Sequence, residues 1–114
     1  MNAIVVTKEF LGCLEKFESA GRAEAKKIKE AMLDAQIHGR IRLPPRPETR
    51  YSIPNIHKFG VSKGDRLVVQ VIEQSSKKTF VFLFAGIHND TEAWLKGHQD
   101  YRWVARNSDS RAFQ

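Results

Sequence analysis

Two consecutive apolar segments near the middle of this chain constrain its fold more than any other feature. The first, DRLVVQVIEQ at residues 65–74, is rich in β-branched residues, and the second, TFVFLFAGIH at residues 79–88, is apolar on both faces. Such residues favour strands, and a strand without polar alternation is expected in a sheet covered on both sides. The polar segment SSKK that joins them is typical of a turn. The sequence therefore predicts an antiparallel hairpin with a central strand.

The N-terminal part of the chain changes from a strand pattern to a helix pattern. Residues 4–6 are Ile-Val-Val, a short strand, and Thr7 is expected to be the N-cap of a helix. Gly21 interrupts the helical pattern, and Gly39 is expected to end it. The apolar residues that recur at helical spacing on either side of the break are Phe10, Leu11, Leu14 and Phe17, then Ala25, Ile28, Met32 and Ala35. Two helices joined by a tight break predict an antiparallel helical hairpin.

The rest of the chain completes an α+β domain. All four prolines lie between residues 44 and 54, so this stretch is an extended connection, and residues 53–61 are the weakest strand candidate. Asn89 and Asp90 can cap a short helix that ends near Gly97. We therefore expect one domain over residues 1–107, followed by a polar, frayed tail over residues 108–114. Its fold class is a small antiparallel β-sheet with the helical hairpin packed on one face and a short C-terminal helix.

Positive charge is concentrated in one segment of the chain. The net charge is +6, and residues 39–66 carry seven Lys and Arg against Glu48 and Asp65 only. The seven are Arg40, Arg42, Arg46, Arg50, Lys58, Lys63 and Arg66. Arginine prefers planar, two-pronged contacts with phosphate, and clustered basic residues are typical of nucleic-acid binding. The alternative is a solvated surface that binds an acidic protein partner.

The alternation of side chains along residues 66–72 places one arginine near a histidine. Leu67 and Val69 are expected to face the helices, whereas Arg66 points to the face that the helices leave open. His88, in step with Phe80, Phe82 and Phe84, lies at the opposite end of the neighbouring strand. Because these two ends meet in a hairpin, Arg66 and His88 are expected to converge on one edge.

Several classes of function are not favoured by the sequence. The four histidines are far apart and no HExxH motif, glycine-rich phosphate loop or membrane-spanning run is present, so we expect no metal, no cofactor and a cytoplasmic protein. The single cysteine, Cys13, allows no internal disulfide. Arginine, lysine, histidine and aromatic residues suit RNA cleavage by the 2′-hydroxyl of the RNA itself, which needs no metal.

Two motifs resemble those of a known toxin family. Gly64 to Gln74 (GDRLVVQVIEQ) is similar to the glycine-x-Arg-Leu strand of the RelE/ParE superfamily of bacterial type II toxins. Phe82 to Trp94 (FLFAGIHNDTEAW) is similar to the family's apolar strand that ends in glycine and a basic residue before a short helix. The resemblance implies the toxin of a toxin–antitoxin pair. In the RelE branch it would cleave mRNA on the ribosome; in the ParE branch it would inhibit DNA gyrase without nuclease activity. An inactive nucleic-acid-binding module of the same fold is a third possibility.

The resemblance also implies roles for individual residues. Arg66 matches the arginine that contacts the scissile phosphate, and His88 matches the basic position after the glycine. Trp94 stands where many members have a tyrosine, and its two open roles are to stack on a base or to pack in the core. His57 and Lys58 lie near the positions where the family has a pair of lysines. Because one of these lysines and the tyrosine are missing here, the resemblance does not assign the general base. The residues expected to bind substrate or the antitoxin are Arg40, Arg42, Arg46, Arg50, Lys63 and Trp94.

Overall fold

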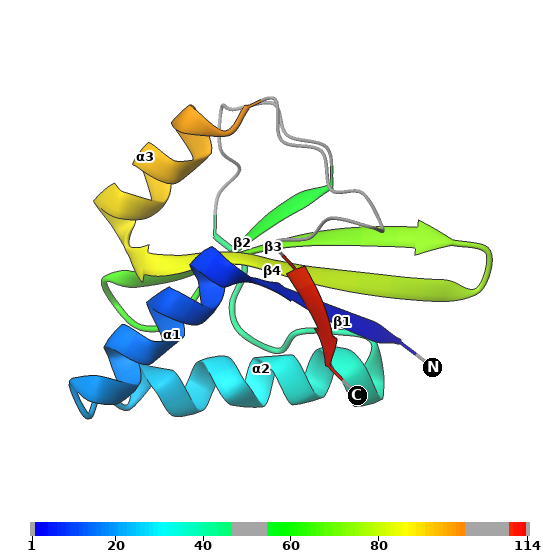
Figure 1. Ribbon diagram of the computed structural model, residues 1–114, viewed down its shortest axis with the longest axis horizontal. Helices are drawn as coiled ribbons and strands as arrows, with labels where there is room; N and C mark the ends of the chain where they lie inside the picture. Colours follow the sequence, from blue (N-terminus) through cyan, green and yellow to red (C-terminus); the bar gives the residue numbers. More distant parts are fainter. Residues whose placement is uncertain (1, 47–54, 100–109, 114) are drawn as a thin grey trace.

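The computed structural model describes residues 2–46, 55–99 and 110–113, which form one sheet with helices on both faces (Figure 1). The order of the elements confirms the α+β class predicted from the sequence. Along the chain the elements are β1 (Ala3–Thr7), α1 (Lys8–Ser19), α2 (Glu24–His38), β2 (Ile56–Gly60), β3 (Asp65–Gln74), β4 (Lys77–Ile87), α3 (His88–Gly97) and β5 (Ser110–Phe113).

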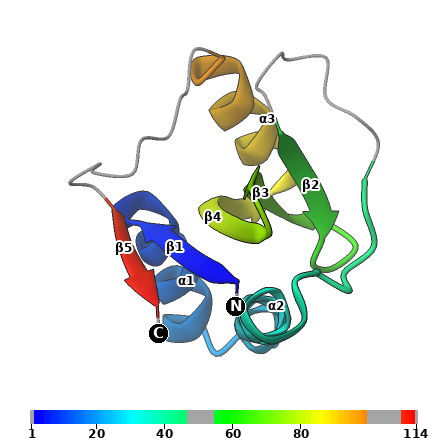
Figure 2. The same cartoon turned by 90° about the vertical axis from the view of Figure 1, so that its right-hand side faces the viewer.

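The sheet is mixed, and its strand order is β2-β3-β4-β1-β5. The β2–β3 and β3–β4 pairs are antiparallel, as expected, and so is the β1–β5 pair, but β1 runs parallel to β4, with Val5 opposite Val81. The expectation of a fully antiparallel sheet was therefore wrong for this pair. The physical reason lies in the path of the chain: α1 and α2 cross one face of the sheet and deliver the chain to the far edge at β2 (Figure 2). The β3–β4 hairpin then returns it beside β1 in the same direction.

The helical hairpin α1–α2 packs on one face of the sheet, as predicted. The hydroxyl of Thr7 accepts a hydrogen bond from the Phe10 amide at 3.1 Å, so Thr7 is the N-cap of α1. Gly39 ends α2 with φ 68°, a left-handed conformation that glycine adopts without strain. The buried residues between this hairpin and the sheet include Ile4, Val6, Phe10, Leu14, Phe17, Ile28, Met32, Leu67, Val69, Phe80 and Phe82.

The opposite face of the sheet is covered by α3 (Figure 2). Trp94 and Leu95 pack there against Val68, Val81 and Leu83 in a second buried cluster. We expected this face to be open, and that expectation was wrong. The alternation of β3 was predicted correctly: Leu67 and Val69 belong to the α1–α2 side and Val68 to the α3 side. Arg66, which shares the direction of Val68, therefore lies at one end of a covered face.

A β-bulge changes the alternation in β4. Val68 pairs with Phe84, but the next residue, Val69, pairs with Phe82, so Leu83 is an extra residue on β4. Phe82 packs on the α1–α2 side, whereas Phe84 packs on the α3 side. The prediction that Phe80, Phe82, Phe84 and His88 share one face assumed an uninterrupted strand, and it fails at this bulge.

The ends of the strands also differ from the sequence-based bounds. β4 begins at Lys77, so the β3–β4 turn is only Ser75 and Ser76, and Ser75 has φ 56°. The segment expected to be a polar tail contains the strand β5, which pairs with β1. Within the described residues, no helix is long and apolar enough to cross a membrane.

Candidate functional site

The β3–β4 hairpin brings Arg66 and His88 to the same end of the sheet. Arg66 pairs with Gly86 and Asp65 pairs with Ile87, so His88 follows directly beyond the last pair. The backbone amide of His88 donates a hydrogen bond to the carbonyl of Gly64 at 2.9 Å. The juxtaposition expected from the sequence is therefore present in the backbone.

The guanidinium of Arg66 is held by the turn that precedes β3. Its Nη1 donates to the carbonyl oxygens of Asp65 at 3.0 Å, Ser62 at 3.2 Å and Lys63 at 3.4 Å. The side chain is half-buried. The neighbouring Asp65 carboxylate accepts hydrogen bonds from Arg22 and Ser62 rather than from Arg66.

His88 is the first residue of α3, and its side chain is exposed. The N-cap position is Ile87, which has extended backbone, and no side chain caps it. The expected capping by Asn89 and Asp90 is not observed, because the helix begins two residues before Asp90. Asp90 lies in the first turn instead, where a carboxylate interacts favourably with the helix dipole. The imidazole of His88 is thus presented to solvent at the end of the sheet that carries Arg66.

His57 and Lys58 lie on opposite faces of the edge strand β2, as successive strand residues do. Lys58 Nζ forms an ion pair with Glu92 Oε2 at 2.7 Å, and its side chain is only 8% exposed. Lys58 therefore joins β2 to α3 on the face that also carries Arg66. His57 is exposed, and its ring lies 6.3 Å from that of Phe59, which packs toward α1 and α2. The structure thus brings Lys58 near Arg66 and separates His57 from both.

Trp94 is a core residue rather than an open stacking surface. It is 6% exposed, and its indole Nε1 donates to Glu9 Oε1 at 2.7 Å. Its ring lies 6.0 Å from the ring of Phe84 and is stacked on the ring of His98 at 4.1 Å. The predicted stacking of Trp94 on a base would require this packing to open. The sequence pattern was compatible with a core position and with a base-stacking surface. The packing of α3 on the sheet shows that Trp94 is in the core.

The arginines of the basic segment are distributed over different surroundings. Arg42 and Arg46 line a hollow of 440 Å³ against α2, together with Asp34 and Ser62. The Arg46 side chain lies over Gly60, where a Cβ atom would come within 2.4 Å of Nε. Arg40 and Lys63 are exposed, and Arg50 lies outside the described residues. Arg42 and Arg46 thus border α2, whereas Arg66 belongs to the face covered by α3.

Arg42 makes a two-pronged ion pair with Asp34, with Nε and Nη2 at 2.9 and 2.6 Å from the two carboxylate oxygens. These hydrogen bonds lower the pKa of the Asp34 carboxyl, although burial opposes the shift. Near pH 4 the Asp34 carboxyl is therefore more often protonated in the unfolded chain than in the folded chain. The ion pair adds to the free energy of unfolding at pH values above the ordinary pKa of an aspartate, about 3.9. The contribution is lost as the pH falls through the lowered value of the folded state.

We expect Arg42→Gln to lower the free energy of unfolding at pH 7, and the difference from the wild type to shrink steadily below about pH 4. Urea unfolding at a series of pH values measures this difference. Arg40→Gln, which removes the same charge from an exposed neighbour, is the control and should have the smaller effect. A difference that is constant between pH 7 and pH 2 would contradict the role of this ion pair.

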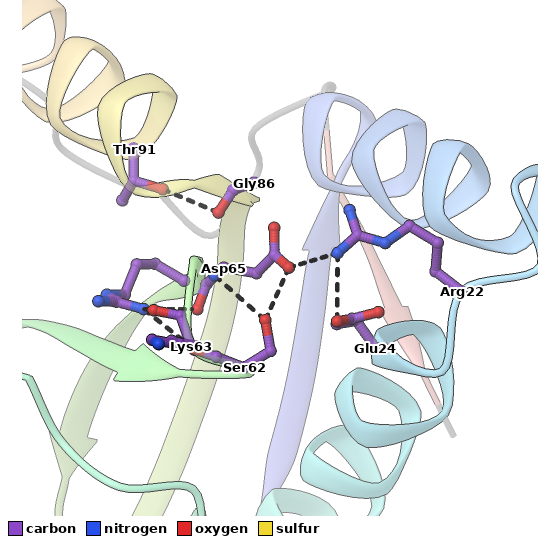
Figure 3. Close-up of polar contacts among 8 residues, drawn as sticks. Arg22, Glu24, Ser62, Lys63, Asp65, Gly86 and Thr91 are labelled. Atoms are coloured by element: carbon purple, nitrogen blue, oxygen red, sulfur yellow. Dashed lines mark hydrogen bonds and ion pairs between the residues drawn. The ribbon is translucent and has the colours of Figure 1, made fainter.

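The sequence analysis missed an ion-pair network centred on Asp65 (Figure 3). Arg22, in the connection between α1 and α2, lies with Nη2 2.6 Å from Asp65 Oδ2 and 3.1 Å from Glu24 Oε2. The only signal in the sequence was that Asp65 is one of two acidic residues in the basic segment. Within the described residues, His, Cys, Asp and Glu side chains form no group of three that could hold a metal ion.

No protein-family model matches the sequence, and no curated protein matches it. Solved structures do match. The YoeB/ParE toxin from Agrobacterium tumefaciens is 16% identical, with a TM-score of 0.61 over 75% of this chain and 97% of that one. YafQ from E. coli strain BL21(DE3) is 15% identical, with a TM-score of 0.58 over 80% and 98%. A chain of the E. coli DinJ–YafQ complex is 16% identical, with a TM-score of 0.60 over 79% of this chain and 97% of that one. At these identities the likeness concerns the fold, and it confirms the fold that the resemblance to the RelE/ParE superfamily implied.

Proposed function

We propose that this chain is the toxin of a type II toxin–antitoxin pair and cleaves ribosome-bound mRNA. The observation that carries the proposal is the convergence of Arg66 and His88 at one end of the sheet, where the Gly64 carbonyl binds the His88 amide. The fold shared with the YoeB/ParE and YafQ toxins supports it.

The proposed reaction uses the RNA's own 2′-hydroxyl as the nucleophile. Its oxygen attacks the adjacent phosphorus, the bond from phosphorus to the 5′-oxygen breaks, and a 2′,3′-cyclic phosphate forms. One proton leaves the 2′-hydroxyl and one joins the 5′-oxygen, so the reaction is balanced without an added reagent. A neutral imidazole has one nitrogen that accepts a proton and one that donates, so His88 is suited to one of these proton transfers.

Arg66 would stabilise the charge that develops on the non-bridging phosphate oxygens. A guanidinium presents planar donors at the spacing of two phosphate oxygens, and it stays charged at every physiological pH. Because the carbonyls of the turn hold Nη1, the group is oriented before the substrate arrives. Preorganised charge of this kind is a large term in catalysis. Lys58 lies on the same face, but its charge is balanced by the ion pair with Glu92, so Arg66 carries this role alone in the proposal.

The proposed partner is an acidic antitoxin. The chain carries a net charge of +6, with the excess concentrated in residues 39–66. Opposite charge on an antitoxin would accelerate association and cover the basic surface. The solved DinJ–YafQ structures are complexes of a toxin with its antitoxin, which supports the same arrangement for this chain.

The second candidate function is inhibition of DNA gyrase without RNA cleavage. Two observations favour it: Lys58 is committed to an ion pair, and Trp94 is buried, so neither side chain is presented in the way that the nuclease branch implies. A related structure is itself described as a YoeB/ParE toxin.

A translation extract programmed with a defined mRNA separates these functions. If the nuclease proposal is right, purified protein at a concentration near that of the ribosomes will produce new mRNA ends that primer extension detects. Supercoiling by DNA gyrase in a parallel reaction will be unchanged. Intact mRNA together with inhibited supercoiling would replace the nuclease proposal with the gyrase alternative. No effect in either assay would leave an inactive nucleic-acid-binding module.

A further inference from the structure

The turn that joins β2 to β3 holds both residues of the proposed active site. Carbonyl oxygens of this turn accept hydrogen bonds from Arg66 Nη1, and the carbonyl of Gly64 accepts one from the His88 amide. The conformation of residues 61–65 therefore determines the direction of the Arg66 guanidinium and the position at which α3, the helix that carries His88, begins.

Asp65 stabilises the conformation of this turn through hydrogen bonds to other residues of the turn. Its side chain Oδ2 accepts a hydrogen bond from Ser62 Oγ at 2.7 Å, and its backbone amide donates to the same hydroxyl at 3.3 Å. The backbone oxygen of Asp65 accepts from the Val61 amide at 3.0 Å. Asp65 is only 3% exposed, so these contacts are made away from competing water.

Arg22 holds the Asp65 carboxylate from the opposite side (Figure 3). Its Nη2 lies 2.6 Å from Oδ2, and the guanidinium also contacts Glu24 and lies 5.0 Å above the Phe17 ring. A buried carboxylate is retained in its charged form only where a cation and hydrogen bonds replace its hydration. Arg22 thus connects the α1–α2 hairpin to the turn that holds Arg66.

Both of these contacts to the Asp65 carboxylate are made by the same oxygen. Arg22 Nη2 and Ser62 Oγ each donate a hydrogen bond to Oδ2, so this one atom joins the α1–α2 hairpin to the turn.

We infer that Asp65 and Arg22 are positioning residues for Arg66, an inference that rests on the proposed function. Through the turn, the ion pair between them holds the Arg66 guanidinium in the orientation in which it meets the scissile phosphate. Neither residue touches the substrate. Small displacements of an oriented group reduce rates strongly, so loss of this anchor is expected to lower the cleavage rate constant on the order of 10- to 100-fold.

The test is a double-mutant cycle on the rate constant for cleavage of ribosome-bound mRNA at saturating protein. Asp65→Asn should lower this rate constant in the wild-type background and change it less than about twofold in the Arg66→Ala background. A loss of equal size in both backgrounds would overturn the inference. Glu18→Gln, which breaks the surface ion pair with Lys29 between α1 and α2, is the control and should leave the rate constant unchanged. Arg22→Lys keeps a positive charge but not the planar fork, and it should reproduce part of the loss.

A second measurement does not depend on cleavage. Nitrogen-15 NMR of the arginine side chains should show restrained guanidinium rotation for Arg66 in the wild type and averaged signals in Asp65→Asn, with the Arg66 signals identified by their loss in Arg66→Ala. Unchanged Arg66 signals in Asp65→Asn would overturn the inference even if the rate fell. If the wild type cleaves no RNA but the Arg66 signals change as expected, the nuclease proposal fails and the positioning role stands. Thermal unfolding of each variant confirms that it is folded.

Discussion

Replacement of Arg66 by alanine is expected to lower the rate constant for mRNA cleavage by about 10²- to 10³-fold, the effect of removing one preorganised donor from a transition state. The expression of Arg66→Ala should accordingly no longer arrest growth. The guanidinium is half-buried and, within the described residues, is bound through Nη1 to carbonyls of its own turn, so its loss leaves the two cores intact. Primer extension on programmed ribosomes measures the rate, and urea unfolding measures the stability.

Two variants separate the geometry of Arg66 from its charge. Arg66→Lys keeps the charge but cannot make a two-pronged contact with phosphate, so it should recover only part of the activity. Lys77→Ala removes the same charge at the opposite end of the β3–β4 hairpin, where Lys77 pairs with Gln74, and should keep full activity. If Arg66→Ala and Lys77→Ala lower the cleavage rate constant equally, Arg66 contributes only to the general positive potential of the surface. If Arg66→Ala cleaves mRNA at the wild-type rate, Arg66 takes no part in the mechanism.

Replacement of Trp94 by alanine is expected to reduce the free energy of unfolding by about 3–5 kcal/mol, the usual cost of truncating a large buried aromatic side chain. The indole is 6% exposed, stacks on His98 at 4.1 Å and donates to Glu9 at 2.7 Å, so the variant loses both packing and a hydrogen bond to a carboxylate. A domain of this size is stable by only about 5–15 kcal/mol, so Trp94→Ala should be partly unfolded at 37 °C. Urea unfolding measures the loss.

Trp94→Phe distinguishes a core residue from a base-stacking residue. Phenylalanine keeps most of the buried volume and an aromatic face but loses the N–H donor to Glu9. It should retain a large part of the stability, and its cleavage activity should follow the folded fraction. A fully folded Trp94→Phe that has lost RNA affinity would show that the ring contacts the substrate, against the packing described for α3.

Much of the fold follows from patterns that are local in the sequence. The two apolar segments at residues 65–74 and 79–88 form the β3–β4 hairpin, and the helical spacing after Thr7 forms α1. Thr7 caps that helix and Gly39 ends the next, because capping depends on the conformation of a few adjacent residues. The meeting of Arg66 and His88 was also predictable, since the two ends of any hairpin are close together.

The bulge in β4 and the cover over the second face of the sheet were not predictable in the same way. Because Leu83 is one extra residue in β4, the side chain of Phe84 lies on the opposite face of the sheet from that of Phe82. No rule based on composition identifies where a strand contains such an extra residue. The exposure of Trp94 depended on whether α3 lies on the sheet or extends away from it. An amphipathic turn is compatible with both arrangements, so the burial of Trp94 became clear only once α3 was placed.

The amino-acid order by itself determined which segments become helices and strands and which charges gather between residues 39 and 66, because periodicity, capping and charge are properties of neighbouring residues. Only the tertiary structure decided that β1 runs parallel to β4, that Lys58 pairs with Glu92 and that Arg22 holds Asp65. Each of these contacts joins residues far apart in the chain. Its free energy depends on burial and on hydrogen-bond geometry, and neither exists until the layers have packed.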